Sequence, residues 1–121
     1  MLKKIQILLT EDKEINQEIF IGLLEGTGIS VDIAVNGQEA IEKSREKEYS
    51  LIVMDIEMPI MNGYEATKII RTENSNIPII ALTANNSTHD RLKTKQLGMN
   101  AHLSKPIEPK ILYQTFSKYI A

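Results

Sequence analysis

The sequence predicts an α/β fold in which five parallel β-strands alternate with five α-helices. Five short runs rich in β-branched and aliphatic residues recur along the 121 residues. Two of them, LIVM (51–54) and IIAL (79–82), are apolar at every position, as strands of a parallel sheet covered on both faces require. Segments with helical periodicity separate the runs, and this alternation favours a parallel sheet with right-handed crossovers.

The chain carries no internal repeat, low-complexity stretch or linker, so we expect residues 1–121 to form a single domain. Five strands in a chain of this length favour a flavodoxin-like, doubly wound sheet with the strand order 2-1-3-4-5. The predicted strands are IQILL (5–9), VDIAV (31–35), LIVM (51–54), IPIIAL (77–82) and AHL (101–103).

Apolar residues spaced three and four positions apart predict the first two helices. The first helix ends before Gly26-Thr27-Gly28, because glycines terminate helices. The second is the charged segment QEAIEKSREKE (38–48), which we expect to be exposed apart from Ala40 and Ile41. The apolar stripe of the first helix consists of Ile15, Ile19, Phe20, Leu23 and Leu24.

Three further helices follow the same logic. The third helix starts after Asn62-Gly63. The fourth covers about 87–97, and Gly98, just after it, is expected to end the helix in a left-handed conformation. Pro109 suits the first turn of the fifth helix. The apolar face of the third helix carries Tyr64, Thr67, Ile69 and Ile70, and that of the fifth carries Ile111, Leu112, Thr115, Phe116, Tyr119 and Ile120.

The composition excludes several kinds of function. The chain has no cysteine, which excludes a disulfide, a thiol nucleophile and a cysteine-based metal site, and which fits a reducing compartment. A net charge of −2 indicates no general affinity for nucleic acid. No apolar run approaches the roughly 18 residues of a membrane span. We therefore expect a cytoplasmic protein without nucleic-acid or membrane contacts.

Polar residues follow the predicted strands at their carboxyl ends, where ligands bind in doubly wound sheets. Glu11 and Asp12 follow the first strand, Asp55 the third, Thr83 the fourth and Lys105 the fifth. Taken singly, these residues have ordinary structural interpretations: a helix cap for Asp12, a turn for Asp55 and a surface cation for Lys105. Their shared position at strand ends favours a common site instead.

Three clustered carboxylates repel one another, and a divalent cation relieves the repulsion. Oxygen ligands without cysteine or a facing histidine favour a hard ion, Mg²⁺ or Mn²⁺, in a phosphoryl-transfer site. Lys105 would then stabilise a phosphoryl oxygen, and Thr83 would donate a hydrogen bond to another. Asp55, the central acid, is the candidate nucleophile. We expect its carboxylate to lie at the open rim of the sheet rather than buried.

Four stretches together resemble the receiver domain of two-component response regulators, and most closely the receivers of hybrid sensor histidine kinases: LTEDKEINQ (9–17), VMDIEMPIMNGYEAT (53–67), IIALTAN (79–85) and GMNAHLSKPI (98–107). The resemblance implies that Asp55 is the phosphoacceptor. It implies that Glu11, Asp12, Asp55 and the backbone carbonyl of Glu57 hold Mg²⁺. Thr83 would be the switch hydroxyl and Lys105 the phosphoryl-binding lysine, preceding a cis bond to Pro106.

One position departs from the family pattern. Receivers often carry tyrosine or phenylalanine three residues before the lysine, as a rotating switch residue, and here that residue is His102. The resemblance assigns His102 to the switch, whereas the simpler interpretation is an exposed or half-buried histidine at the end of an edge strand. A titratable ring would make its inward position depend on pH.

The resemblance implies a phosphorelay function rather than an enzyme with a small-molecule substrate. A phosphohistidine on a histidine kinase or a histidine phosphotransfer protein would donate to Asp55, and the face formed by helix 4, strand 5 and helix 5 would change shape. The partner would dock on helix 1, where we expect two of four residues to face outward: Ile15, Asn16, Ile19 and Phe20. We expect a monomer or a weak dimer, whether the domain stands alone or belongs to a hybrid kinase.

Two other functions fit parts of the pattern. Asp55-Ile56-Glu57 superficially matches the DxD motif of Mg²⁺-dependent phosphatases of the haloacid dehalogenase superfamily, but that superfamily places its nucleophile after the first strand and requires a second aspartate. The other alternative is a receiver-like interaction module that is never phosphorylated, against which the complete set of site residues argues.

Overall fold

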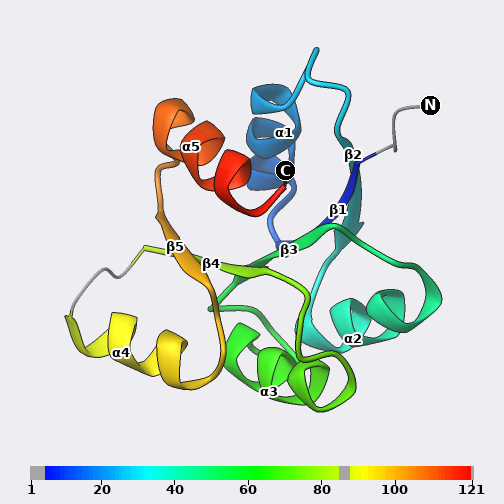
Figure 1. Ribbon diagram of the computed structural model, residues 1–121, viewed down its shortest axis with the longest axis vertical. Coiled ribbons are helices and arrows are strands. Elements are labelled where there is room, and N and C mark those ends of the chain that lie inside the picture. Colours follow the sequence, from blue (N-terminus) through cyan, green and yellow to red (C-terminus); the bar gives the residue numbers. More distant parts are fainter. Residues whose placement is uncertain (1–4, 85–87, 121) are drawn as a thin grey trace.

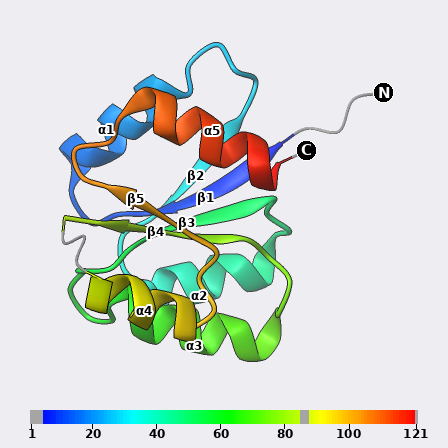
Figure 2. The same cartoon turned by 60° about the vertical axis from the view of Figure 1, so that its left-hand side comes forward.

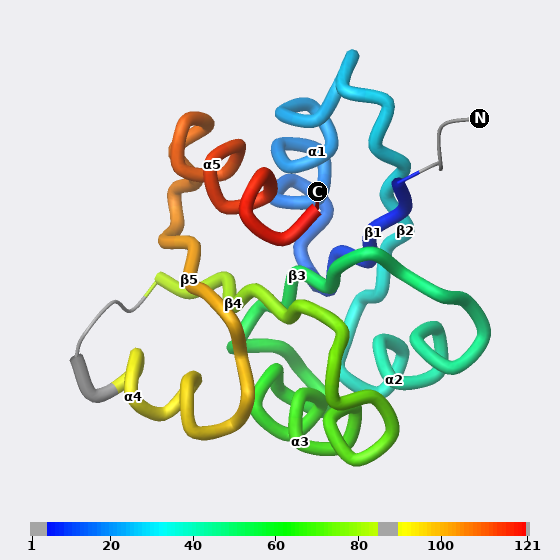
Figure 3. The backbone as a smooth tube through the Cα atoms, viewed as in Figure 1, coloured from blue at the N-terminus to red at the C-terminus, as the bar shows by residue number. Residues whose placement is uncertain are grey.

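Five parallel strands form one sheet in the order β2-β1-β3-β4-β5, which confirms the predicted doubly wound topology. The computed structural model describes residues 5–84 and 88–120. In Figure 3 the chain can be followed from β2 through a helix back to β3, which pairs with β1. The strands are β1 (Gln6–Thr10), β2 (Ser30–Ala34), β3 (Leu51–Asp55), β4 (Ile79–Thr83) and β5 (Ala101–Ser104).

The strand boundaries differ from the predicted ones by one or two residues. The largest shift is in β4, which begins at Ile79 rather than Ile77. Pro78 has no backbone N–H and therefore cannot donate to a ladder. Its carbonyl still accepts from Ile52 N, at 2.9 Å, just before the strand starts.

Helices cover both faces of the sheet, as uniformly apolar parallel strands require (Figures 1 and 2). Two helices, α1 and α5, lie on one face, and the other three lie on the opposite face. The helices are α1 (Glu14–Leu23), α2 (Gly37–Glu46), α3 (Gly63–Glu73), α4 (Thr88–Gln96) and α5 (Pro109–Tyr119).

Local sequence signals account for the helix ends. The side chains of Asn36 and Asn62 cap α2 and α3 by accepting hydrogen bonds from backbone N–H groups three residues later, at 2.8 and 3.0 Å. Gly98 follows α4 with a φ of 92°, and Pro109 lies in the first turn of α5, both as predicted.

The strands supply two separate apolar cores because successive side chains point to opposite faces. Along β3, Leu51 and Val53 pack toward α1 and α5, whereas Ile52 and Met54 pack toward α2 and α3. Phe20 of α1 and Phe116 of α5 meet across the first core with ring centroids 6.1 Å apart. The site is thus built on a strand that is buried along its whole length.

Some residues of the predicted apolar stripes face solvent. Phe20 of α1 and Leu24, which follows the helix, are buried, whereas Ile15 and Ile19 are 65% and 53% exposed, in line with the expectation that two of the four residues named for docking face outward. On α5, Ile111 is also exposed. An apolar stripe that is wider than the buried face of its helix leaves some of its residues exposed. Across the described part of the chain, no helix has the length and apolar character needed to cross a bilayer.

Two glycines make a matched test of the packing around β3. A Cβ added at Gly63, the first residue of α3, would lie 2.2 Å from the backbone oxygen of Asp55, whereas one added at Gly22 of α1 meets nothing within 4 Å. We expect Gly63→Ala to lower the free energy of unfolding by at least about 2 kcal/mol, because the backbone at Asp55 would have to move to make room for the new Cβ. Gly22→Ala should raise it by roughly 0.5–1 kcal/mol, since alanine favours a helix. Urea denaturation measures both, and a Gly63→Ala chain as stable as wild type would contradict this packing.

Candidate functional site

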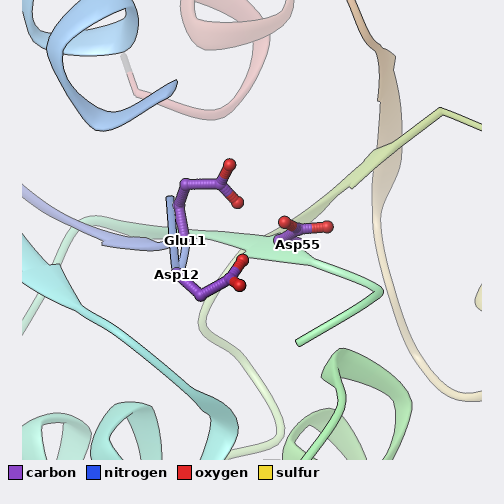
Figure 4. A group of neighbouring side chains, drawn as sticks. All are labelled: Glu11, Asp12 and Asp55. Atoms are coloured by element: carbon purple, nitrogen blue, oxygen red, sulfur yellow. The ribbon is translucent and has the colours of Figure 1, made fainter. Parts of the chain in front are cut away.

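Three carboxylates meet at the carboxyl edge of the sheet. Glu11 and Asp12 directly follow β1, and Asp55 is the last residue of the adjacent parallel strand β3. One carboxylate oxygen from each of the three lies within 4.8 Å of the others. Figure 4 shows the three side chains extending from neighbouring strand ends toward a common space. The predicted convergence of these acids is therefore present in the structure.

Lys105 supplies the balancing positive charge. It directly follows β5, and its Nζ lies 2.9 Å from Asp55 Oδ2 and 3.5 Å from Glu11 Oε1. The Lys105–Pro106 peptide bond is cis, as the family resemblance implied. One ammonium thus contacts two of the three acids, which leaves the cluster with an excess of negative charge.

The carboxylates are buried, which corrects the expectation of an open rim. Asp55 is 3% exposed and Glu11 is 0% exposed. Burial of a charge is tolerated when the charge is paired and hydrogen-bonded. Asp55 meets both conditions, because Lys105 contacts Oδ2 and the backbone N–H of Glu57 donates to Oδ1 at 3.2 Å.

Burial and neighbouring charges shift the ionisation of the site. Burial raises the pKa of Glu11 to about 7, with a further rise from Asp55, while Asn16 and Lys105 act to lower it. Burial acts to lower the pKa of Lys105, but the hydrogen bond and charge of Asp55, together with Glu11, raise it above its ordinary value. The lysine therefore stays cationic, and Glu11 holds its proton more tightly than an ordinary glutamate does.

Two carboxylate oxygens have no hydrogen-bond partner within residues 5–84 and 88–120, and this observation tests whether a metal fits. Glu11 Oε2 and Asp12 Oδ1 are buried and accept no hydrogen bond from the described residues. A helix-capping role does not explain Asp12, since the N-cap of α1 is Lys13. Buried oxygens without donors are costly, and a hard divalent cation such as Mg²⁺ supplies the missing interaction. The donor set therefore fits the ion predicted from the sequence.

Thr83 and Asp55 line the same pocket, of about 150 Å³, together with Lys105 and Asn16. Thr83 ends β4 and is almost fully buried. Its backbone oxygen accepts from the N–H of Lys105 at 2.9 Å, which joins the two residues directly. The side chain of Glu57 is exposed at the pocket edge, and a metal-binding role for its carbonyl stays a prediction.

His102 lies outside this pocket, on the side of β5 that faces α4. Its Nδ1 is 3.3 Å from Thr94 Oγ1, and its Nε2 is buried without a partner among the described residues. Burial lowers the pKa of His102, as does Arg91, while Asp90 acts in the opposite direction. The ring is therefore neutral at pH 7, half-buried as the simpler interpretation expected, and its switch role stays a prediction.

Two residues near the site have features that the sequence analysis did not predict. Asn16 is one of the four residues named for the docking surface, and its side-chain amide donates to Glu11 Oε1 at 2.5 Å. Ile60, in the β3–α3 loop, has a φ of 69° and is 83% exposed. A β-branched residue strongly disfavours positive φ, and the sequence MPIMNG gives no sign of this conformation because it has no glycine there.

Comparisons with known proteins give a consistent result. The family described as response regulator receiver domain matches residues 7–117. Hybrid signal transduction histidine kinase B of Dictyostelium discoideum is 40% identical over 95% of this chain, but the chain spans only 7% of that kinase. The receiver domain of sensor histidine kinase PA1611 from Pseudomonas aeruginosa, solved with a magnesium ion in its active-site cleft, has a TM-score of 0.89 and 35% identity, covering 98% of both chains.

A further similar structure is a complex. It contains the Saccharomyces cerevisiae histidine phosphotransfer signalling protein Ypd1 and the receiver domain of its downstream response regulator Ssk1. The match has a TM-score of 0.90 and 34% identity, and it covers 98% of this chain and 90% of that one.

Replacing Glu11 tests the energetic cost of the acid cluster. Its folded pKa of about 7 exceeds the ordinary 4.5, so the folded state binds the proton more tightly and loses stability as pH rises from about 4.5 to 7. In the absence of divalent metal, we expect Glu11→Gln to raise the free energy of unfolding by roughly 1–3 kcal/mol above pH 7. Near pH 4.5, where Glu11 is protonated in the folded chain, the substitution should change it little. Urea denaturation at both pH values measures the difference, and an equal gain at both would contradict this assignment.

The conformation of Ile60 gives a second test. A left-handed residue with a side chain costs roughly 1–2 kcal/mol, and asparagine tolerates this region better. We expect Ile60→Asn to raise the free energy of unfolding by about 1 kcal/mol. Ile19→Asn is the matched control, since Ile19 is also exposed but helical, and it should lower stability slightly. Denaturation curves in which both variants lose stability equally would show that Ile60 carries no strain.

Proposed function

The chain belongs to the family of response regulator receiver domains, and from that premise we propose that Asp55 accepts a phosphoryl group from a phosphohistidine on a partner protein. A receiver domain is a phosphorylated signalling domain of two-component systems and not a classical enzyme. The observation that carries the proposal is the pairing of Asp55 with Lys105 at 2.9 Å, inside a carboxylate cluster that fits a divalent cation.

The transfer step follows from the groups around Asp55. A carboxylate oxygen of Asp55 attacks phosphorus, the P–N bond to the partner's histidine breaks, and its electron pair returns to the imidazole ring. Lys105 neutralises charge on a phosphoryl oxygen, and the Thr83 hydroxyl donates a hydrogen bond to another. Held by Glu11, Asp12, Asp55 and the Glu57 carbonyl, Mg²⁺ would offset the negative charges brought together there, and Mn²⁺ could replace it.

The acyl phosphate on Asp55 would bias the output face through Thr83. The phosphoryl group adds negative charge and acceptor oxygens, toward which the Thr83 hydroxyl moves. His102 then rotates into the released space, and the α4–β5–α5 face shifts between two populated states. The half-buried, neutral imidazole and its unpartnered Nε2 support an inward position at pH 7.

The phosphodonor we propose is a histidine kinase or a histidine phosphotransfer protein, and the docking surface is α1. Ile15 and Ile19 are the most exposed of the large apolar residues on that helix, and Asn16 on the same helix lines the pocket that holds Asp55. Phe20, expected to contribute, is fully buried and is excluded from this surface. The similar yeast complex supports a phosphotransfer partner.

The remaining proposals concern the whole chain. Residues 1–121 would act as one receiver domain, a monomer or weak dimer, without nucleic-acid or membrane contacts. The net charge of −2 and the absence of cysteine support a cytoplasmic, reducing location. Similarity to a hybrid kinase supports, but does not require, a parent chain that also contains a kinase domain.

Intact-mass spectrometry tests the phosphoacceptor directly. After incubation with Mg²⁺ and a small acyl-phosphate donor, we expect wild type to gain the mass of one phosphoryl group. Asp55→Asn should gain none, whereas the control Asp32→Asn, which changes an aspartate of β2 outside the site, should behave as wild type. Chelation of Mg²⁺ should abolish the adduct.

Three outcomes would count against this proposal. Undiminished labelling of Asp55→Asn would show that another residue is modified. A wild-type chain that stays unlabelled and binds no Mg²⁺ would favour the interaction module that is never phosphorylated. Steady turnover of an aryl phosphate would favour a phosphatase.

A further inference from the structure

Among the three candidate metal-ligand side chains, that of Glu11 is the longest and has the most conformational freedom. A glutamate carboxylate is connected to the backbone by one more rotatable bond than that of an aspartate, and holding it in one orientation costs conformational entropy. Glu11 is nevertheless 0% exposed, and one of its oxygens lies within 4.8 Å of oxygens from Asp12 and Asp55. Some contact must therefore hold this side chain in place.

The amide of Asn16 makes that contact. Asn16 lies in the first turn of α1, and its Nδ2 donates to Glu11 Oε1 at 2.5 Å. The neighbouring Gln17 also donates a hydrogen bond to Glu11. Its Nε2 donates to the main-chain oxygen, at 2.7 Å, and not to the carboxylate. The two amides thus act on different parts of the same residue.

The two carboxylate oxygens of Glu11 consequently differ. Oε1 accepts from Asn16 and lies 3.5 Å from Lys105 Nζ, whereas Oε2 is buried and accepts nothing from the described residues. When a donor holds one oxygen of a carboxylate, the orientation of the group is fixed and the other oxygen stays free to bind a metal ion. Supporting residues orient metal ligands in this way.

We propose that Asn16 is a positioning residue, whose amide fixes the Glu11 carboxylate so that Oε2 is presented to the divalent cation. This inference rests on the proposed function, because it assumes a metal at the acid cluster. It assigns Asn16 to the metal site, whereas the sequence suggested a contact with the partner protein. The side chain lines the pocket shared by Asp55 and Lys105, as this role requires.

Mg²⁺ affinity, measured by calorimetry on the isolated chain without any partner, tests the proposal. We expect Asn16→Ala to weaken Mg²⁺ binding roughly tenfold, since loss of a supporting hydrogen bond typically costs that much. Loss of the hydrogen bond to a buried oxygen should lower the metal-free melting temperature, and the higher helix propensity of alanine offsets part of that loss, so binding is measured well below the melting transition of each variant. Gln17→Ala is the matched control, and its Mg²⁺ affinity should stay within about twofold of wild type.

A double-mutant cycle separates action through Glu11 from any other effect. Glu11→Asp shortens the side chain and removes its reach to Asn16, so adding Asn16→Ala in that background should change Mg²⁺ affinity by less than about twofold. The inference is overturned if Asn16→Ala binds Mg²⁺ as wild type does, or if it costs the same in both backgrounds. A wild-type chain that binds no Mg²⁺ would overturn the metal site of the proposed function as well, which distinguishes the two failures.

Discussion

The ion pair between Lys105 and Asp55 is the contact on which the site depends. It joins residues 50 positions apart, and the same ammonium reaches Glu11, 94 positions away. Three carboxylates at one edge of a sheet repel one another, and burial strengthens that repulsion. The partly exposed ammonium of Lys105 lowers that cost without neutralising the cluster. This excess negative charge is what would favour a divalent cation at the site.

The fold determines where these charges lie. Parallel strands end at one edge, so residues that directly follow β1, β3, β4 and β5 are brought together whatever their separation in the sequence. Uniformly apolar strands and punctuating glycines are local signals, and they were sufficient to predict the strands and the positions of Glu11, Asp55, Thr83 and Lys105 at strand ends. The strand order was predicted by analogy, from five strands in a chain of this length. The start of β4 was missed by two residues, although Pro78 carried the relevant signal.

Features that depend on side-chain packing could not be predicted in this way. The burial of Asp55 depends on how the Lys105 side chain reaches across from β5, which no local pattern encodes. The exposure of Ile15 depends on which line of α1 meets the sheet, and the positive φ of Ile60 depends on the shape of the whole loop. Strain and exposed apolar surface near a site are both common where function competes with stability.

The central claim is that the acid cluster is an unsatisfied site completed by a divalent cation. The melting temperature of the wild-type chain, followed against Mg²⁺ concentration above pH 7, tests this claim most directly. An ion that binds only the folded state should raise stability continuously, by about 2.7 kcal/mol when free Mg²⁺ is a hundred times its dissociation constant. A melting temperature that does not change between chelated and millimolar Mg²⁺ would contradict the account.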